Sequence, residues 1–195
     1  MRHSMPTRGQ RGYSLIEAVL VVAILMILAT ASIINIRAAL RTSEMDRAYD
    51  LTLTQMRQAR QSAIAERRIY RLAFTSPRFL DVKRVEKTGP PTQIGQFTLP
   101  GLIVFQPEPG VPTDPAKTPD QWGTGSLGID FNGAGLIYFQ PDGSARDEGG
   151  RVNGGVIYLA RPGDLPRSRA ITLFGTTGRI KGWRLTRRGS GWAWN

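Results

Sequence analysis

The chain has 195 residues and a formal net charge of +11, with 26 lysines and arginines against 15 aspartates and glutamates, and it contains no cysteine. Disulfides and thiol chemistry are therefore excluded, and packing must stabilise the fold. The single histidine is His3, so the rest of the chain lacks the commonest general base and the usual zinc ligands. We expect no enzyme activity, no cofactor and no metal site.

The N-terminus combines a basic leader with an apolar segment. Residues 1–12 carry three arginines and no acid, and Glu17 is the only charged side chain in the mainly apolar residues 13–36. A helix of that length, rising about 1.5 Å per residue, crosses roughly 30 Å of bilayer hydrocarbon. The positive-inside rule keeps residues 1–12 in the cytoplasm and places the remainder outside. We predict a membrane-spanning helix over 13–36.

Gly12 to Glu17 has the sequence Gly-Tyr-Ser-Leu-Ile-Glu. The small residue precedes the apolar segment, so cleavage there would keep the helix, unlike cleavage of an ordinary secretory signal. The segment resembles the class III signal peptides of type IV pilins and type II secretion pseudopilins. The resemblance implies that a prepilin peptidase cuts after Gly12, that Tyr13 becomes a methylated N-terminus in place of the usual phenylalanine, and that Glu17 is the acidic fifth mature residue.

A charge such as Glu17 costs about 2.5–3.5 kcal/mol at the centre of a bilayer, which makes it a functional candidate. The resemblance implies a role in assembly, in which the N-terminal amine of a neighbouring subunit neutralises it. The implied partners are other major and minor pilins or pseudopilins, after a stage in the bacterial inner membrane with the head in the periplasm. The alternative is a plain signal anchor whose glutamate reaches the membrane interface.

Neither glycine nor proline occurs between Tyr13 and Pro77, which favours one continuous helix. Apolar residues recur there at spacings of three and four. They are Met45, Tyr49, Leu53, Met56, Ala59 and Ala63. This stripe predicts an amphipathic helix over 37–68 that packs on a sheet.

From residue 69 the apolar pattern alternates, as in strands. The predicted strands run over 70–74, 79–85, 96–99, 102–106, 126–131, 135–139, 155–160, 170–174 and 179–185. Residues 107–128 are rich in proline and glycine, which predicts a long exposed loop. The expected fold class is α+β, with a long N-terminal helix packed on an antiparallel sheet in a β-rich head over 69–195.

Four segments, Phe139–Gly143, Gly155–Leu159, Arg169–Leu173 and Gly178–Ile180, resemble the end of the GspH/FimT group of minor pilins and pseudopilins. That resemblance implies a type IV pilin-like fold and a role in assembly or priming of a type IV pilus or a type II secretion pseudopilus. The sequence favours neither system over the other, because the N-terminal segment is common to both.

The C-terminal end is strongly basic. From Arg161 onward, eight lysines and arginines accompany a single acid, Asp164. Basic surfaces with interspersed aromatic residues bind nucleic acids. The candidate nucleic-acid residues are Arg179, Lys181, Arg184, Arg187, Arg188 and Trp192.

Gly178 to Lys181 resembles the Gly-Arg-x-Arg motif of FimT-type minor pilins that capture DNA for transformation. Lys181 keeps the charge of the second arginine but loses its bidentate geometry. The alternative is that these cations form the solvent face of the last strand and that the tryptophans are core or subunit contacts. Three functions stay open: a structural subunit, which we favour, a DNA receptor, and a membrane-anchored enzyme.

Overall fold

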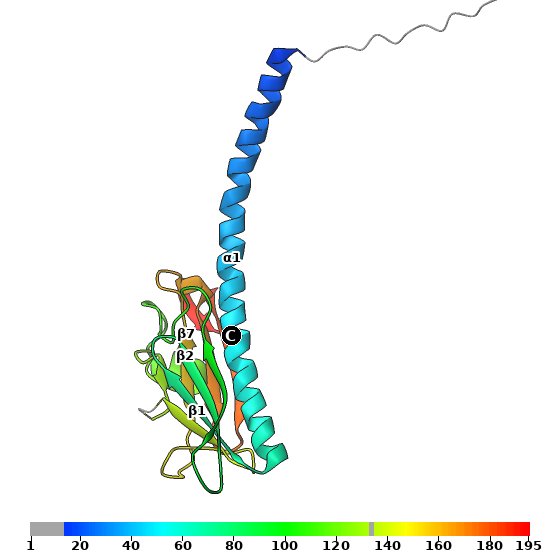
Figure 1. Ribbon diagram of the computed structural model, residues 1–195. Coiled ribbons are helices and arrows are strands. Elements are labelled where there is room, and N and C mark those ends of the chain that lie inside the picture. The colour runs from blue at the N-terminus through cyan, green and yellow to red at the C-terminus, as the bar shows by residue number, and fades with distance from the viewer. Residues whose placement is uncertain (1–13, 133–134) are drawn as a thin grey trace, which may run out of the picture. The chain divides into compact units, whose positions relative to one another are not determined.

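The computed structural model describes residues 14–132 and 135–195, without the side chains of residues 30–38. Contacts divide the chain into an N-terminal unit, Met1–Arg41, and a C-terminal unit, Thr42–Asn195. The long helix predicted from the sequence is α1, Leu15–Glu66 (Figure 1). It ends two residues before the predicted boundary, because Arg67 adopts a left-handed conformation (φ 51°) and the Arg68 N–H donates to the Ala63 carbonyl.

The strands form two antiparallel sheets, where the sequence had predicted one. The first has the order β3-β2-β1-β5-β6, and the second has the order β10-β9-β8-β7-β4. The strands of the first are β1 (Ile69–Thr75), β2 (Phe79–Val85), β3 (Thr92–Thr98), β5 (Leu136–Phe139) and β6 (Ala145–Arg146). Those of the second are β4 (Ile129–Asp130), β7 (Gly155–Leu159), β8 (Arg169–Phe174), β9 (Arg179–Arg188) and β10 (Gly191–Trp194).

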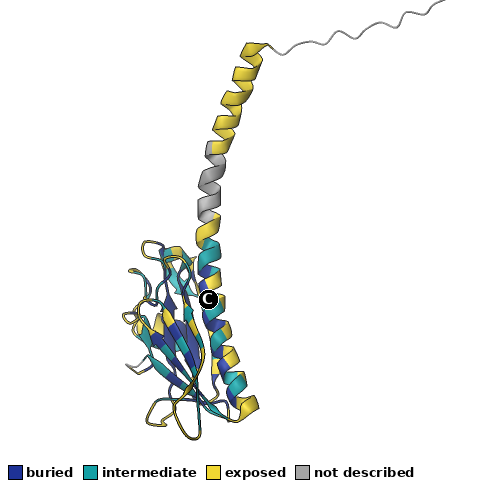
Figure 2. Cartoon of the chain, in the orientation of Figure 1, coloured by how far each residue is buried: buried dark blue, intermediate teal, exposed yellow. Residues whose placement is uncertain are grey.

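The apolar stripe of α1 packs on the sheets, as predicted. Met45, Met56 and Ala63 are fully buried, and Tyr49 packs against the same core while remaining half-buried. The strands contribute Leu72 and Phe139 from the first sheet, among others, and Ile157, Ile171 and Leu173 from the second. Figure 2 shows these buried positions on the part of α1 that belongs to the C-terminal unit. One core is thus shared by the helix and both sheets.

Strands β7 and β8 are buried on both faces. One face joins the shared core, and the other carries a second cluster of Val156, Tyr158 and Ala170, against which Trp122, Trp183 and Trp194 pack. Burial of Tyr158 raises the pKa of its hydroxyl, and the nearby Asp130 carboxylate acts in the same direction. This second cluster explains why the apolar pattern of β7 is continuous rather than alternating.

The expectation that residues 107–128 form an exposed loop is wrong in part. The segment has no long strand and includes the 3₁₀ turns η1 (Pro115–Lys117) and η2 (Pro119–Gln121), but Thr118 and Pro119 are buried. The Thr172 hydroxyl donates to the Asp120 carboxylate at 2.6 Å, and the Trp122 and Phe174 rings contact each other edge to face. The segment therefore covers the second cluster on the sheet.

Several predicted strands differ from the observed strands in length or position. The strand predicted over 102–106 is replaced by a single bridge between Val104 and Ala160, which flank buried core residues. The strand over 126–131 shrinks to β4, and β3 begins earlier than predicted, at Thr92. Sequence analysis missed β6 and β10, whose short lengths show no clear alternation.

Gly182 on β9 permits close approach of the helix. A Cβ added there would meet the Tyr49 hydroxyl oxygen at a distance far below van der Waals contact. We expect Gly182→Ala to lower the free energy of unfolding by about 1–3 kcal/mol through overpacking. Denaturant unfolding checks this, with Gly191→Ala as the control because an added Cβ at Gly191 meets no atom within 4 Å. Equal stability of the two variants would contradict the packing argument.

Candidate functional site

The first turn of α1 contains Glu17, the predicted assembly residue. The backbone N–H groups of Glu17 and Ala18 donate to the Ser14 carbonyl at 3.0 and 3.2 Å, and the Glu17 side chain is exposed. A carboxylate in a first turn interacts favourably with the helix dipole. Ser14 and Glu17 also have the Ser-x-x-Glu spacing of a capping box. Sequence reasoning overlooked this spacing, which is typical of a helix start.

Apolar side chains are exposed all along the described start of α1. Between Leu15 and Leu28, the exposed fractions of the large apolar side chains range from 48% to 84%. Contiguous apolar surface of this extent marks a contact surface for protein or lipid. Within residues 14–132 and 135–195, however, no helical stretch is both long and apolar enough to cross a membrane.

Two sequence predictions concern residues that lie partly or wholly outside the described part of the chain. Gly12 and Tyr13, the predicted cleavage and methylation residues, lie outside the described residues. The predicted span over 13–36 likewise includes Tyr13 and the side chains of 30–36, which are outside them.

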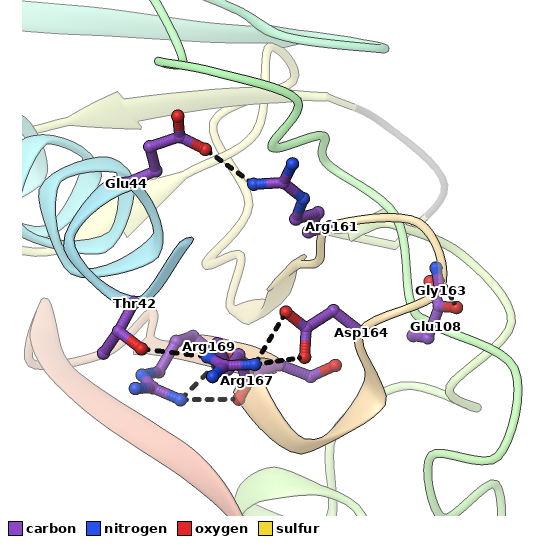
Figure 3. A network of polar contacts seen from close by, with 9 residues as sticks. Thr42, Glu44, Glu108, Arg161, Gly163, Asp164, Arg167 and Arg169 are labelled. Carbon is purple, nitrogen blue, oxygen red and sulfur yellow. Dashed lines mark hydrogen bonds and ion pairs between the residues drawn. The ribbon is translucent and has the colours of Figure 1, made fainter. Parts of the chain in front are cut away.

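A polar network ties the first residues of the C-terminal unit to the chain between β7 and β8 (Figure 3). The Arg161 guanidinium lies 2.7 Å from the Glu44 carboxylate. The Arg167 Nε donates to the Thr42 hydroxyl at 2.9 Å, while its Nη1 is 3.0 Å from both oxygens of Asp164. Arg161 and Arg167, two of the eight basic residues counted at the C-terminal end, are therefore engaged in contacts within the chain.

Arg169, at the start of β8, is a third cation used for packing. Only 7% of it is exposed, and its guanidinium donates to the Asp46 carboxylate at 3.2 Å and to the carbonyls of Arg167 and Ser168 at 3.0 and 3.2 Å. A buried guanidinium is tolerated only with such partners. Arg161, Arg167 and Arg169 thus hold α1 to the second sheet.

Arg179 and Lys181, the cations of the Gly-Arg-x-Arg-like segment, also have partners within the chain. The Lys181 ammonium lies 3.5 Å from the centre of the Trp183 ring and 3.6 Å from the Asp120 carboxylate. The Arg179 guanidinium lies 5.1 Å from the centre of the Phe174 ring. These cation–π contacts and the ion pair hold both side chains on one face of β9.

The remaining candidate residues lie on the β9–β10 hairpin. Arg184, Arg187 and Arg188 are exposed, and none forms an ion pair with a residue in the described part of the chain. Trp192 is half-buried and lies opposite Arg187 in the strand register. At about 3.3 Å per residue, Arg187 is roughly 26 Å along β9 from Arg179. The candidate residues therefore extend along a strand, and Arg187, Arg188 and Trp192 gather at its end.

Comparison with protein families finds the prokaryotic N-terminal methylation motif over residues 7–33. The match supports a type IV pilin-like prepilin. Such a prepilin is processed by prepilin peptidase and assembles with other pilins. Searches of curated proteins and of solved structures found no match to this chain.

The prepilin motif covers the segment singled out from the sequence, because residues 7–33 include Gly12, Tyr13 and Glu17. It ends before the C-terminal unit begins at Thr42. For that unit, none of the described residues forms a group of three or more histidine, aspartate or glutamate side chains positioned to hold a metal ion.

The contact between Arg169 and Asp46 makes a testable contribution to stability. We expect Asp46→Ala to lower the free energy of unfolding by about 1–3 kcal/mol, because it leaves a buried cation without its carboxylate. This is less than for a fully buried pair, since the Asp46 side chain is 40% exposed. Denaturant unfolding measures the loss. Asp50→Ala is the control, because Asp50 is exposed and has no ion pair with a described residue.

The double variant Asp46→Ala/Arg169→Met removes both charges and should recover much of the loss. If it were less stable than Asp46→Ala alone, the carbonyl contacts of Arg169 would be the main source of its stabilising effect.

Proposed function

We propose that this chain is a minor pilin or minor pseudopilin of the GspH/FimT type, which takes part in assembly or priming of a type IV pilus or a type II secretion pseudopilus. The proposal rests on one observation above all: the prepilin motif coincides with the part of α1 whose apolar side chains are exposed. Such a surface is stable in water only when lipid or other helices cover it.

The proposed mechanism begins in the inner membrane. Residues 13–36 anchor the chain there with the C-terminal unit in the periplasm, and prepilin peptidase cuts between Gly12 and Tyr13. The cleavage creates a new amine, which is methylated, at the start of the apolar helix. As helices of neighbouring subunits bundle, the apolar side chains of α1 cover one another and exclude water.

Glu17 has a defined task in this bundle. Its carboxylate lies in the first turn of α1, close in sequence to the new N-terminus. Once water is excluded, an unpaired carboxylate costs several kcal/mol, and the amine of a neighbouring subunit offsets that cost. The pairing fixes the axial register of the subunits, because only one offset brings each amine to a carboxylate.

We expect Glu17→Ala to abolish incorporation into the filament while leaving processing and the C-terminal unit intact. The measurement is the amount of this chain in purified filaments, with terminal sequencing of the membrane-bound form to verify cleavage before Tyr13. Glu17→Asp is the control, since it keeps the charge and should keep part of the incorporation. Normal incorporation of Glu17→Ala would rule out the assembly role.

The proposal includes no catalytic role and no cofactor. After removal of residues 1–12, the mature chain contains neither histidine nor cysteine. Two acidic side chains of the C-terminal unit lie at turns, where Asp142 accepts a hydrogen bond from the Ser144 N–H at 2.8 Å and Asp147 accepts one from the Arg151 N–H at 2.8 Å. Turn formation accounts for these side chains.

A second candidate function is DNA binding, favoured by cations of the β9–β10 hairpin that form no ion pair with any described residue. Arg187 is exposed on the same face as its register partner Trp192, which suits a phosphate backbone and a stacked base, and Arg188 is an exposed cation at the same end of the strand. The predicted nucleic-acid residues are not equally free to contact DNA. Because Lys181 is engaged by Asp120 and Trp183, the hairpin end is the better candidate surface.

We expect Arg187→Ala/Arg188→Ala to weaken double-stranded DNA binding by the full chain and to reduce the salt slope by about 2, because each lost phosphate contact reduces it by about 1. A salt series of titrations in non-ionic detergent measures this. Lys181→Ala, which removes one charge instead of two, is the control and should change the slope little. Half as large a change in this control as in the double variant would show attraction by general charge rather than a DNA surface.

A further inference from the structure

A groove separates the late turns of α1 from the turn between β8 and β9. Its volume is about 520 Å³. Arg57, Arg60 and Gln61 line it from the helix, and Thr177, Gly178 and Arg179 line it from the turn and the start of β9. Because the helix residues are spaced by three and four, they lie on one face. The groove therefore brings together three arginines from two distant parts of the chain.

No carboxylate lines this groove. None of its three arginines forms an ion pair with any residue in 14–132 or 135–195. This contrasts with Arg84, whose guanidinium contacts Glu66 at 3.1 Å and Glu86 at 2.8 Å. Three guanidinium groups at one place repel one another, and an anion relieves that repulsion.

Arg60 is held in place without being neutralised. Its Nε donates to the Gly143 carbonyl at 3.1 Å, and its Nη2 donates to the Thr177 carbonyl at 2.9 Å. Carbonyl oxygens orient the guanidinium but carry no formal charge. The side chain is thus fixed at low conformational cost before any ligand arrives, which is what a binding site requires.

Gly178 brings the turn against the helix. It has φ +62°, and an added Cβ would clash with the Gly143 carbonyl oxygen and the Arg60 side chain. Only glycine combines this conformation with this approach. Arg179 follows directly and lines the same groove as Arg60, with its guanidinium 5.1 Å from the centre of the Phe174 ring.

We propose that this groove binds a phosphate group, specifically a phosphomonoester dianion. Guanidinium groups bind phosphate oxygens through paired, charge-assisted hydrogen bonds. Three cations without a carboxylate match a dianion better than the single charge of a carboxylate or of one phosphodiester. The site goes beyond the proposed function in filament assembly, and it is separate from the hairpin surface that contains Arg187.

The test uses the full chain in non-ionic detergent, titrated with inorganic phosphate and then with glycerol 3-phosphate at constant ionic strength. The ³¹P line width reports binding, and the thermal midpoint reports stabilisation. The test variants are Arg57→Gln and Arg179→Gln, because neither side chain forms an ion pair with a described residue. Arg60 is left unchanged because it donates hydrogen bonds to two backbone carbonyls. Arg47→Gln and Arg151→Gln are matched controls, because both side chains are exposed and neither lines the groove, so each variant loses the same charge elsewhere.

We expect saturable binding and a rise of about 3 °C in the thermal midpoint at ten times the dissociation constant. Arg57→Gln and Arg179→Gln should each weaken binding at least tenfold, whereas both controls should bind as the wild type does. The proposal is overturned if phosphate gives no more stabilisation than chloride, or if all four variants weaken binding equally.

A double-stranded oligonucleotide serves as the competing ligand. Failure to displace glycerol 3-phosphate from the groove supports a monoester site. The monoester assignment would be overturned in favour of a phosphodiester by the opposite result. In that result the oligonucleotide displaces glycerol 3-phosphate at a phosphate concentration below the one at which glycerol 3-phosphate half-saturates the groove. The filament assay of Glu17→Ala is independent of either result, so failure of this site leaves the proposed function unaffected.

Discussion

Burial of one face of α1 is the constraint on which the C-terminal unit depends. Both sheets direct buried apolar side chains at this face, so neither sheet has a complete core without the helix. The small residues Ala48, Ala59 and Ala63 let strands approach closely, and Gly182 does the same from β9. An apolar stripe alone would be insufficient, because side-chain volume also has to match on both sides.

Sequence patterns predicted the elements with one buried face. The stripe of α1 and the hairpin of β1 and β2 follow clear periods, and both are confirmed by the structure. The patterns failed where burial is two-sided. In β7 every side chain is buried, so its sequence could not indicate that a second cluster exists or that residues 107–128 cover it. Coverage by a distant segment leaves no local period.

The candidate functional residues likewise include some that the sequence could identify and some that it could not. Glu17 could be identified from its neighbours in the sequence, because a basic leader and a glycine precede it and an apolar segment follows it. The cationic C-terminal end was harder to interpret, since formal charge does not reveal which cations are paired. The acids that pair with Arg161 and Arg169 are Glu44 and Asp46, which precede them by 117 and 123 residues. Only the fold separates these structural arginines from the unpaired ones.

The polar network at the start of the C-terminal unit has a mechanical consequence. Thr42 and Glu44 precede Met45, the first buried core residue of α1 in this unit, so tension applied to the helix from its N-terminal side reaches their contacts before it reaches the apolar core. The arginines bonded to Thr42, Glu44 and Asp46 flank or begin β8, which is the central strand of its sheet. Load would therefore pass from the helix backbone into a strand bonded on both edges, where shearing requires many hydrogen bonds to break together.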